Sequence, residues 1–524
     1  MKLPTAILGV LFPRNEPVLG GYSSGEVWQK RLWLYALIYL GVLVSMGALL
    51  ATSGTNMLMP FSGALAIIGL LIVWALPESK NPPVKWIGRL LFAFIIALLF
   101  WPDYLAFDFP GLPWITALRI FGVPLAFVFL VSLSVSGWYR NQLSDRLAPT
   151  IIVNRLLLIF ALIAGLSIGL SAEPTDSLNK FIVAILYWFI IFYAAVWIFS
   201  KPGNAMILAY VIWFFALLTC MIGIQEWRMQ QIPWANHIPS FIAVDDPVIQ
   251  NILSAKSRAA TGIYRVQSKF TTPLGFAEFL AFSTPFVIYF LVYGKNVLVR
   301  AAALATLPLL FTSISRTDSR LGAAGFFMSI LLFLVAWSVT QWKKEKGSVF
   351  GPAFTIAYPF IFIAFMIATF VVGRLRAMVW GTKAQSFSSQ AREAQVEMGL
   401  PMVWSSPWGH GIGKGAETLN YRNLAGGLTI DTYYLALALE FGVIGFLVYA
   451  GIFFGALLYG VKYLFQVQTR EHLLLIPFMI LISVFIIVKS VFAQQENHPL
   501  VFATLGALCA MCWRIKIERG AARP

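Results

Sequence analysis

Residues 274–294 read LGFAEFLAFSTPFVIYFLVYG, a run in which only Glu278 is charged. A helix of about 20 apolar residues is long enough to cross the hydrocarbon core of a bilayer. Similar runs recur along all 524 residues, which are 59% hydrophobic and only 11% charged, whereas soluble domains carry roughly 25% charged residues. The composition excludes a soluble enzyme and a disordered or fibrous chain. It predicts an all-α, polytopic membrane protein.

A hydropathy window of about 19 residues predicts about 14 (12–14) transmembrane helices. They lie near residues 32–53, 57–77, 86–102, 113–137, 151–171, 181–200, 205–224, 274–294, 298–314, 321–341, 352–373, 432–461, 473–493 and 499–514. The first of these reads as a signal anchor, because residues 1–29 are mixed and polar. We therefore expect five regions: N-terminal helices (1–224), a first long loop (225–273), central helices (274–373), a large loop (374–431) and C-terminal helices (432–524).

The net charge of +16 is divided unevenly between the two sides of this predicted topology. One set of intervals, which includes 78–89, 138–155, 342–350 and both termini, is rich in Lys and Arg, so the positive-inside rule places it in the cytoplasm. Three outer loops are nevertheless basic, with thirteen bases against eight acids in 225–273, 315–320 and 374–431. Clustered arginines at a membrane surface suit an anionic lipid head group such as a pyrophosphate. The alternative is that each base is merely solvated or paired.

Two short segments of these loops hold the strongest arginine candidates. Arg265 lies in YRVQSKFTTP (264–273), where Pro273 suits the first turn of a helix. Arg316 and Arg320 lie in SISRTDSRLG (313–322), between two apolar runs, where charge is costly unless it is partnered. Arg320 is the stronger candidate of this pair.

The large loop supplies a fourth arginine and the candidate bases. Arg392 is followed by Glu397 and by PWGHGIGKG (407–415), which contains His410 and whose alternating glycines allow close backbone approach to a ligand or form a flexible turn. The loop ends at Asp431, which also suits a helix N-cap.

Several other site classes lack support in the sequence. The glycines do not form a phosphate-binding loop after a strand, so we expect no nucleotide site. The four histidines are scattered without metal-ligand spacing, so we expect neither a metal nor another cofactor. The three cysteines lie in apolar runs, where no disulfide is expected. Charged residues inside predicted spans, such as Arg119, Glu278, Glu440 and Lys489, are either functional or paired locally.

Taken in order, these pieces resemble the O-antigen polymerase and O-antigen ligase family of bacterial polytopic glycosyltransferases. The resemblance covers about 258–450 and rests on Arg265 before Pro273, on Ser319-Arg320, on Arg392 with the glycine-rich segment, and on Asp431-Thr432 followed by Gly442 and Gly445. Two departures stand out. Asp431 occupies the position of the histidine found in ligases, and Ser268 stands where many relatives have glycine.

The resemblance implies a GT-C-like fold in the bacterial inner membrane, with both termini cytoplasmic and a large helical periplasmic loop. It implies transfer of a glycan from a polyprenyl-pyrophosphate-linked donor to a sugar hydroxyl on the periplasmic face, without a metal. Arg265, Arg316, Arg320 and Arg392 would bind the pyrophosphate, and Asp431, Glu397 or His410, in that order, would act as the base.

Several functional alternatives remain open. Because Asp431 replaces the ligase histidine, a surface-polysaccharide polymerase is favoured over a ligase that transfers glycan to lipid A core. A lipid-linked glycan flippase or secondary transporter, and a non-catalytic assembly partner, are the competing classes. Expected partners are the lipid-linked donor, an acceptor glycan or glycolipid, and the bilayer; a chain-length regulator protein is a further candidate, and nucleic acid is not expected.

Overall fold

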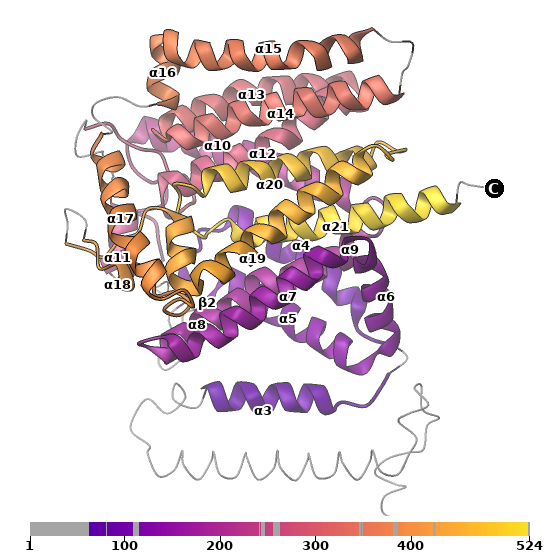
Figure 1. The fold of residues 1–524 in the computed structure, drawn as a ribbon, viewed down its shortest axis with the longest axis vertical. Coiled ribbons are helices and arrows are strands. Elements are labelled where there is room, and N and C mark those ends of the chain that lie inside the picture. Colours follow the sequence, from indigo (N-terminus) through magenta and orange to yellow (C-terminus); the bar gives the residue numbers. More distant parts are fainter. Residues whose placement is uncertain are drawn as a thin grey trace, which may run out of the picture.

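The structure, a computed structural model, describes residues 62–79, 81–107, 115–239, 242, 247–254, 262–344, 347, 349–380, 386–422 and 426–521. These residues are almost wholly helical (Figure 1). The longer helices are α3 (Ser62–Ala75), α4 (Val84–Phe100), α5 (Ala117–Val135), α6 (Gly137–Leu147), α7 (Ile151–Ser167), α8 (Pro174–Ala184), α9 (Ile190–Phe199), α10 (Asn204–Met229), α12 (Pro273–Tyr293), α13 (Val297–Arg316), α14 (Arg320–Lys344), α15 (Phe350–Val371), α17 (Ser386–Ser405), α19 (Tyr433–Leu464), α20 (Leu475–Val488) and α21 (His498–Ala521).

The remaining elements are short. They are α11 (Pro247–Leu253), α16 (Gly373–Val379), α18 (Gly415–Leu419), the 3-10 turns η2 (Ala148–Thr150), η3 (Ile168–Leu170) and η6 (His472–Leu474), and the π-helical turn η4 (Ile185–Phe189). Strands β1 (Ala106–Phe107) and β2 (Ile115–Thr116) form one antiparallel pair, with Ala106 opposite Thr116.

Ten helical stretches of the described chain are long and apolar enough to cross a membrane, which confirms a polytopic all-helical membrane protein. The apolar run at 32–53 lies outside the described residues, and the other thirteen predicted runs coincide with helices. Three of those helices, α3, α4 and α20, are short, with 14, 17 and 14 residues. The total of fourteen spans therefore stays a prediction.

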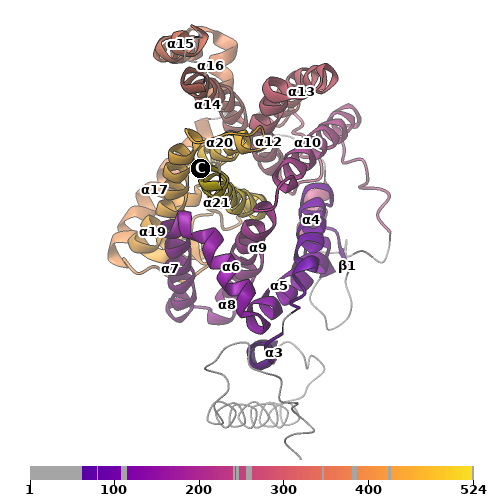
Figure 2. The same cartoon turned by 90° about the vertical axis from the view of Figure 1, so that its right-hand side faces the viewer.

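The long helices lie side by side in one bundle (Figures 1 and 2). Helices α12 and α21 form its centre, because 89% and 83% of the residues in their most apolar 18-residue stretches are buried. In the corresponding stretch of α15, at the edge, only 6% are buried. Helix α21 packs along α9, and α19 packs along α7. The exposed apolar faces of the outer helices suit lipid, because lipid tails are as apolar as those side chains.

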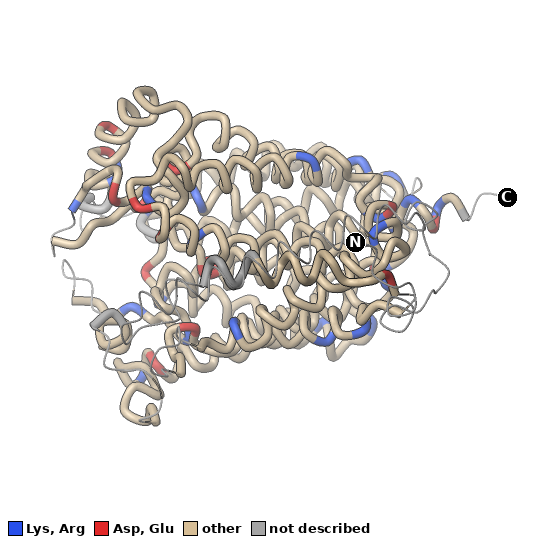
Figure 3. Tube along the Cα trace, turned by 90° about the horizontal axis from the view of Figure 1, so that it is seen from below, with Lys and Arg blue, Asp and Glu red and all other residues tan. Residues whose placement is uncertain are grey.

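Charged residues gather at the two ends of the bundle and leave its middle nearly free of charge (Figure 3). One end, called here the loop end, carries α11, α16, α17 and α18, while the C-terminal end of α21 lies at the opposite end (Figure 1). This distribution is what a bilayer requires, because charge is costly at its centre. Arg119 fits the pattern: it lies in the first turn of α5, where its N–H donates to Thr116 Oγ1 (3.3 Å).

Candidate active site

The segment before α12 packs against the turn that joins α13 to α14. The N–H of Val266 donates to the carbonyl of Arg316 (3.1 Å), and Arg265 Nε donates to the carbonyl of Thr317 (2.9 Å). Arg320 begins α14 three residues after Thr317. The structure therefore brings the backbones that carry Arg265, Arg316 and Arg320 together at the loop end.

A buried carboxylate on α10 fixes this segment. Glu226, fully buried, accepts hydrogen bonds from Tyr264 Oη (2.9 Å) and from the backbone N–H groups of Gln267 (3.0 Å) and Ser268 (2.6 Å). Ser268 has a φ of +53°, a left-handed conformation that glycine adopts at the lowest cost. This conformation gives a physical reason for the glycine expected at that position in relatives.

Arg320 reaches from α14 to the large loop. Its Nη1 donates to the carbonyl of Trp380 (2.8 Å), and its Nη2 lies 3.5 Å from Ser389 Oγ on α17. Further along α17, the buried side chain of Gln395 accepts a hydrogen bond from the N–H of Asp431 (2.8 Å). Helix α17 thus spans the distance between the starts of α14 and α19.

The spacing along α17 places a third candidate between these two contacts. Ser389, Arg392 and Gln395 are three residues apart, and such residues lie on one face of a helix. Ser389 contacts Arg320 and Gln395 contacts the backbone N–H of Asp431, so this face, called here the bridging face, links the starts of α14 and α19, with Arg392 between the two contacts.

Glu397 and Arg316 are not part of the bridging face. Glu397 follows Gln395 by two residues, about 200° around the helix, and is exposed on the other side of α17. The guanidinium of Arg316 lies over the ring of Trp227 on α10, 3.8 Å from its centroid. Arg316 is therefore occupied by a cation–π contact at the edge of the cluster.

The glycine-rich segment approaches a helix of the same chain. Helix α19 is interrupted at Gly442, whose φ is +68°. Two carbonyls that the interruption releases, those of Leu439 and Glu440, accept hydrogen bonds from the N–H groups of His410 (2.9 Å) and Gly411 (3.1 Å). The close backbone approach predicted from these glycines is thus made to α19. The glycine-rich segment packs against the interruption of α19, and this contact is called here the interlock.

The two partners of this interlock both need glycine. A Cβ on Gly442 would collide with the carbonyl of Pro407, and a Cβ on Gly409 would collide with the carbonyl of Glu440. His410 Nδ1 lies 3.1 Å from the carbonyl of Leu439, so one ring nitrogen of this candidate base is already engaged with α19.

Lys414 ties the same segment to α8. Its buried ammonium contacts Glu173 (2.6 Å), Glu417 (2.8 Å) and Asp176 (2.9 Å). Burial acts to lower the pKa of Lys414, but the three carboxylates outweigh burial and raise that pKa. The carboxylates have the mutual spacing of metal ligands, yet the lysine already supplies a cation to all three.

Polar groups in the connection between α20 and α21 form buried contacts with α12. Lys489 Nζ and Glu278 Oε1 form a fully buried ion pair (2.8 Å), and Asn497 Nδ2 donates to the other oxygen of Glu278 (2.8 Å). The local pairing expected for Lys489 is therefore confirmed. Lys489 also donates to the carbonyl of Gln494, which fixes the connection between the two helices.

Glu496 holds the end of the Arg265 segment. Its carboxylate accepts hydrogen bonds from the hydroxyl (3.0 Å) and the N–H (3.3 Å) of Thr271. Burial raises the pKa of Glu496, although the charge of nearby Lys269 opposes this shift. Burial also lowers the pKa of Lys269, whose ammonium donates to the carbonyl of Leu98 (2.6 Å).

The sequence analysis did not identify four of these residues as parts of the site. Glu226, Gln395 and Glu496 each orient a predicted site segment through a long-range contact, and Lys414 locks the glycine-rich segment. The available signal was the position of Glu226 and Glu496 at the edges of apolar runs, where unpartnered charge is costly. Sequence spacing alone does not identify their partners.

A comparison with known protein families matches part of the chain. Residues 305–450 match the family described as O-Antigen ligase, and no curated protein matches the chain. The match includes Arg316, Arg320, Arg392, His410 and Asp431, and so contains the whole bridging face. The family resemblance seen in the sequence is thus confirmed for this segment, which implies a membrane glycosyl-transferring enzyme of surface-polysaccharide assembly.

Proposed function

We propose, from the membership of residues 305–450 in the O-antigen ligase family, that this chain is a surface-polysaccharide polymerase. It transfers glycan from a polyprenyl-pyrophosphate-linked donor to a sugar hydroxyl of an acceptor glycan. The observation that carries this proposal is the bridging face of α17, on which Arg392 lies between a contact to Arg320 and a contact to the backbone of Asp431. Cations for a leaving pyrophosphate and a base for an attacking hydroxyl are the two requirements of such a transfer.

The arginines bind the pyrophosphate of the donor. Arg320 stands at the N-terminus of α14, where the helix dipole also favours an anion. Arg265 is oriented through its Nε and Arg392 lies on the bridging face, so both extend the positive charge around Arg320. These guanidinium groups stabilise the negative charge that develops on the leaving group, and the reaction proceeds without a metal.

Asp431 serves as the general base. Its carboxylate accepts the proton of the acceptor hydroxyl while that oxygen bonds to the anomeric carbon, and the bond from this carbon to the pyrophosphate oxygen breaks. The polyprenyl pyrophosphate leaves with the bonding electron pair. His410 ranks second because its Nδ1 is engaged with Leu439, and Glu397 ranks third because it lies away from the bridging face.

The family description supports a second candidate, an O-antigen ligase whose acceptor is lipid A core. The polymerase is preferred because Asp431 replaces the ligase histidine. A deletion strain separates the two. Loss of everything beyond single repeats indicates a polymerase, whereas full-length polymer retained on its carrier indicates a ligase.

The proposed setting is the bacterial inner membrane, with both termini cytoplasmic and the loop end in the periplasm. The Lys and Arg residues of the intervals 78–89, 138–155 and 342–350 support this orientation under the positive-inside rule. Purified protein incubated with a lipid-linked donor is the direct test of the enzyme. Formation of longer glycans supports the proposal, and proton- or sodium-dependent flux without glycan transfer would replace it with a transporter.

A further inference from the structure

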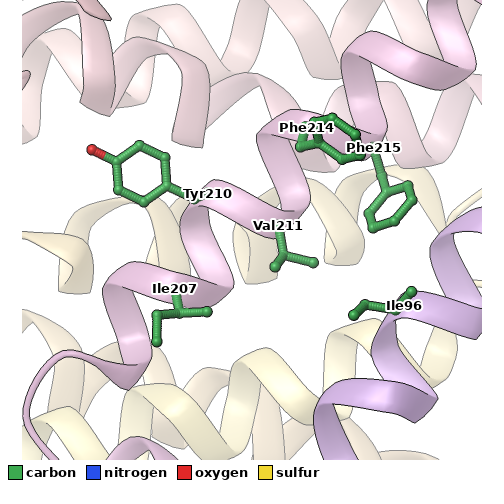
Figure 4. Close-up of a pocket in the computed structure, with 6 residues that line it drawn as sticks. All are labelled: Ile96, Ile207, Tyr210, Val211, Phe214 and Phe215. Carbon is green, nitrogen blue, oxygen red and sulfur yellow. The ribbon is translucent and has the colours of Figure 1, made fainter.

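An open hollow between α4 and α10 is lined almost entirely by hydrocarbon (Figure 4). Its lining consists of Ile96, Ile207, Tyr210, Val211, Phe214 and Phe215. Such a surface suits any lipid tail, because lipid tails are as apolar as these side chains. Groups that select a ligand by its charge lie elsewhere, around α6, at the end of the bundle opposite the loop end (Figure 1).

Four buried polar atoms at that end have no hydrogen-bond partner among the described residues. They are Tyr139 Oη and the Nε and Nη1 atoms of Arg146, all on α6, and the indole Nε1 of Trp197 on α9. Tyr139 and Arg146 are seven residues apart and so share one face of α6. Both contact Trp197: the ring centroids of Tyr139 and Trp197 are 4.5 Å apart, and Cζ of Arg146 lies 3.7 Å from the Trp197 centroid. The four atoms therefore form one cluster.

The chemistry of this cluster defines its missing partner. Buried polar atoms are nearly always hydrogen-bonded in proteins, so several unpaired atoms in one place indicate a ligand or an ordered water. Indole and guanidinium nitrogens only donate hydrogen bonds, and a tyrosine hydroxyl can donate one as well. The partner must therefore offer several acceptor atoms within a small space.

The cluster also carries excess positive charge. The ammonium of Lys201, in the turn after α9, lies 5.8 Å from the ring centroid of Trp197. Burial lowers the pKa of Lys201, and the charge of Arg146 lowers it further, as expected for two cations that lie close together. Among the described residues neither cation forms an ion pair, and Asp145, beside Arg146 in the sequence, is exposed. An anion is therefore the partner that satisfies both charge and hydrogen bonding.

A phosphate group meets these requirements. It is negatively charged, offers several acceptor oxygens, and matches the planar fork of a guanidinium. The site is open on one side, because Arg146 is only half-buried and Lys201 is exposed. We propose that Arg146 and Lys201, backed by Tyr139 and Trp197, bind the phosphate of an anionic lipid head group.

The surroundings favour a lipid as the source of this phosphate. Trp138 packs edge-on against Trp197, with centroids 5.9 Å apart, and is 55% exposed. The ring centroid of Trp513, on α21, lies 5.4 Å from Cζ of Arg146. Tryptophan is enriched at the level of the lipid head groups, and basic pockets between transmembrane helices bind anionic head groups. A bound head group would join α6, α9 and α21, which contact one another at this site.

Native mass spectrometry of the full-length protein in detergent measures bound lipid directly. The probes are phosphatidylglycerol, which is anionic, and phosphatidylcholine, whose phosphate is neutralised by its own choline. We expect tighter binding of phosphatidylglycerol. Arg146→Gln and Lys201→Gln should each weaken it by about tenfold, because each removes a charge-assisted hydrogen bond. Lys462→Gln removes one exposed base from the same end of the bundle, on α19, and is the matched control that should bind like the parent.

Two conservative variants locate the contact more closely. Arg146→Lys keeps the charge but loses the planar fork, so its affinity for phosphatidylglycerol should fall between those of the parent and Arg146→Gln. Tyr139→Phe removes only the hydroxyl and should also weaken binding. If Arg146→Gln does not fold, Lys201→Gln decides the test, because Lys201 is exposed.

Three results would contradict the proposal. Equal phosphatidylglycerol affinity in the parent and in the glutamine variants would overturn the site and leave ordered water as the partner of the four atoms. Equal binding of phosphatidylcholine would overturn the preference for an anion. Inorganic phosphate that raises the Tm of the parent as much as phosphatidylglycerol does, but not the Tm of Arg146→Gln, would overturn the lipid as the source of the phosphate.

Discussion

The side-chain oxygen of Gln395 accepts a hydrogen bond from the backbone N–H of Asp431 at 2.8 Å, which fixes the start of α19 against the middle of α17. Gln395 is fully buried, so this contact is shielded from water. It fixes the backbone of Asp431 at Gln395, which is three residues from Arg392 along α17. The position of the proposed base is therefore set by the same helix that carries a proposed cation.

Asp431→Asn should lower the rate of glycan transfer by about 10² or more, the usual contribution of a general base. The substitution keeps the backbone N–H that binds Gln395, so the fold should be preserved. The measurement is kcat of purified protein with a lipid-linked donor. Glu397→Gln, on the side of α17 away from Gln395, is the control and should retain near-normal kcat. If Glu397→Gln lost activity and Asp431→Asn kept it, Glu397 would be the general base.

Arg265→Ala and Arg320→Ala should each abolish long-chain polysaccharide in cells while protein levels stay normal. Lysine in place of Arg320 keeps the charge but loses the planar fork, so Arg320→Lys should still lower kcat/KM by about tenfold or more. Arg316→Ala should have a smaller effect, because Arg316 packs on Trp227. Chain length is read from gels of cell extracts; normal chains in both Arg265→Ala and Arg320→Ala would refute the arginine assignment.

Gly442→Ala should destabilise the protein, because the added methyl group collides with the carbonyl of Pro407 and the residue has a φ of +68°. Strain of this kind costs about 1–3 kcal/mol. Gly455→Ala, in the same helix, meets only a methyl group of Val153 at 3.7 Å and is the matched control. Thermal unfolding in detergent measures both variants, and equal Tm values would show that the interlock contributes no stability.

Lys489→Met should be strongly destabilising, by about 3–5 kcal/mol, because it leaves the charge of Glu278 buried without its partner. The double variant Lys489→Met with Glu278→Gln removes both charges, and an amide can still pair with Asn497. It should therefore recover much of the lost stability. A double-mutant cycle of unfolding free energies quantifies the coupling, and purely additive effects would contradict the pairing.

Glu496 should contribute to a pH dependence of stability. Burial raises its pKa above the ordinary value of 4.5, so the folded protein holds this proton at a higher pH than the unfolded chain does. The parent should therefore gain stability on acidification from neutral pH toward 4.5 and lose it as the pH rises through the folded pKa, whereas Glu496→Gln, whose side chain stays neutral, should lack this dependence. Tm values of both proteins across this range test the sign, with exposed Glu393→Gln as the control.

The helical spans could be predicted from the sequence because each is decided locally by the hydropathy of about 20 consecutive residues. The run 274–294 predicted α12 nearly to the residue. The arginines of the loops were singled out for a similar reason, since charge beside an apolar run stands out. Which of them converge was beyond the sequence, because Arg265 and Thr317 are 52 residues apart and meet only through tertiary contacts.

The glycine-rich segment shows the limit of pattern reasoning most directly. Alternating glycines predict close backbone approach, and the approach exists, but its target is the interrupted helix α19. The interruption at Gly442 lies inside an apolar run that reads as an unbroken span. Only the structure shows that the glycine-rich segment packs against the interruption of α19 at Gly442.

The same segment ties the region that matches the family to the N-terminal helices of this chain. The backbone of Ile412 forms hydrogen bonds with Ser167 and Ser177, and Lys414 forms ion pairs with Glu173 and Asp176. These four partners precede residue 305 and lie outside the family match. A chimaera that grafts residues 305–450 onto the N-terminal helices of a relative would lose these four attachments. A graft that carries residues 167–177 together with 305–450 would keep them.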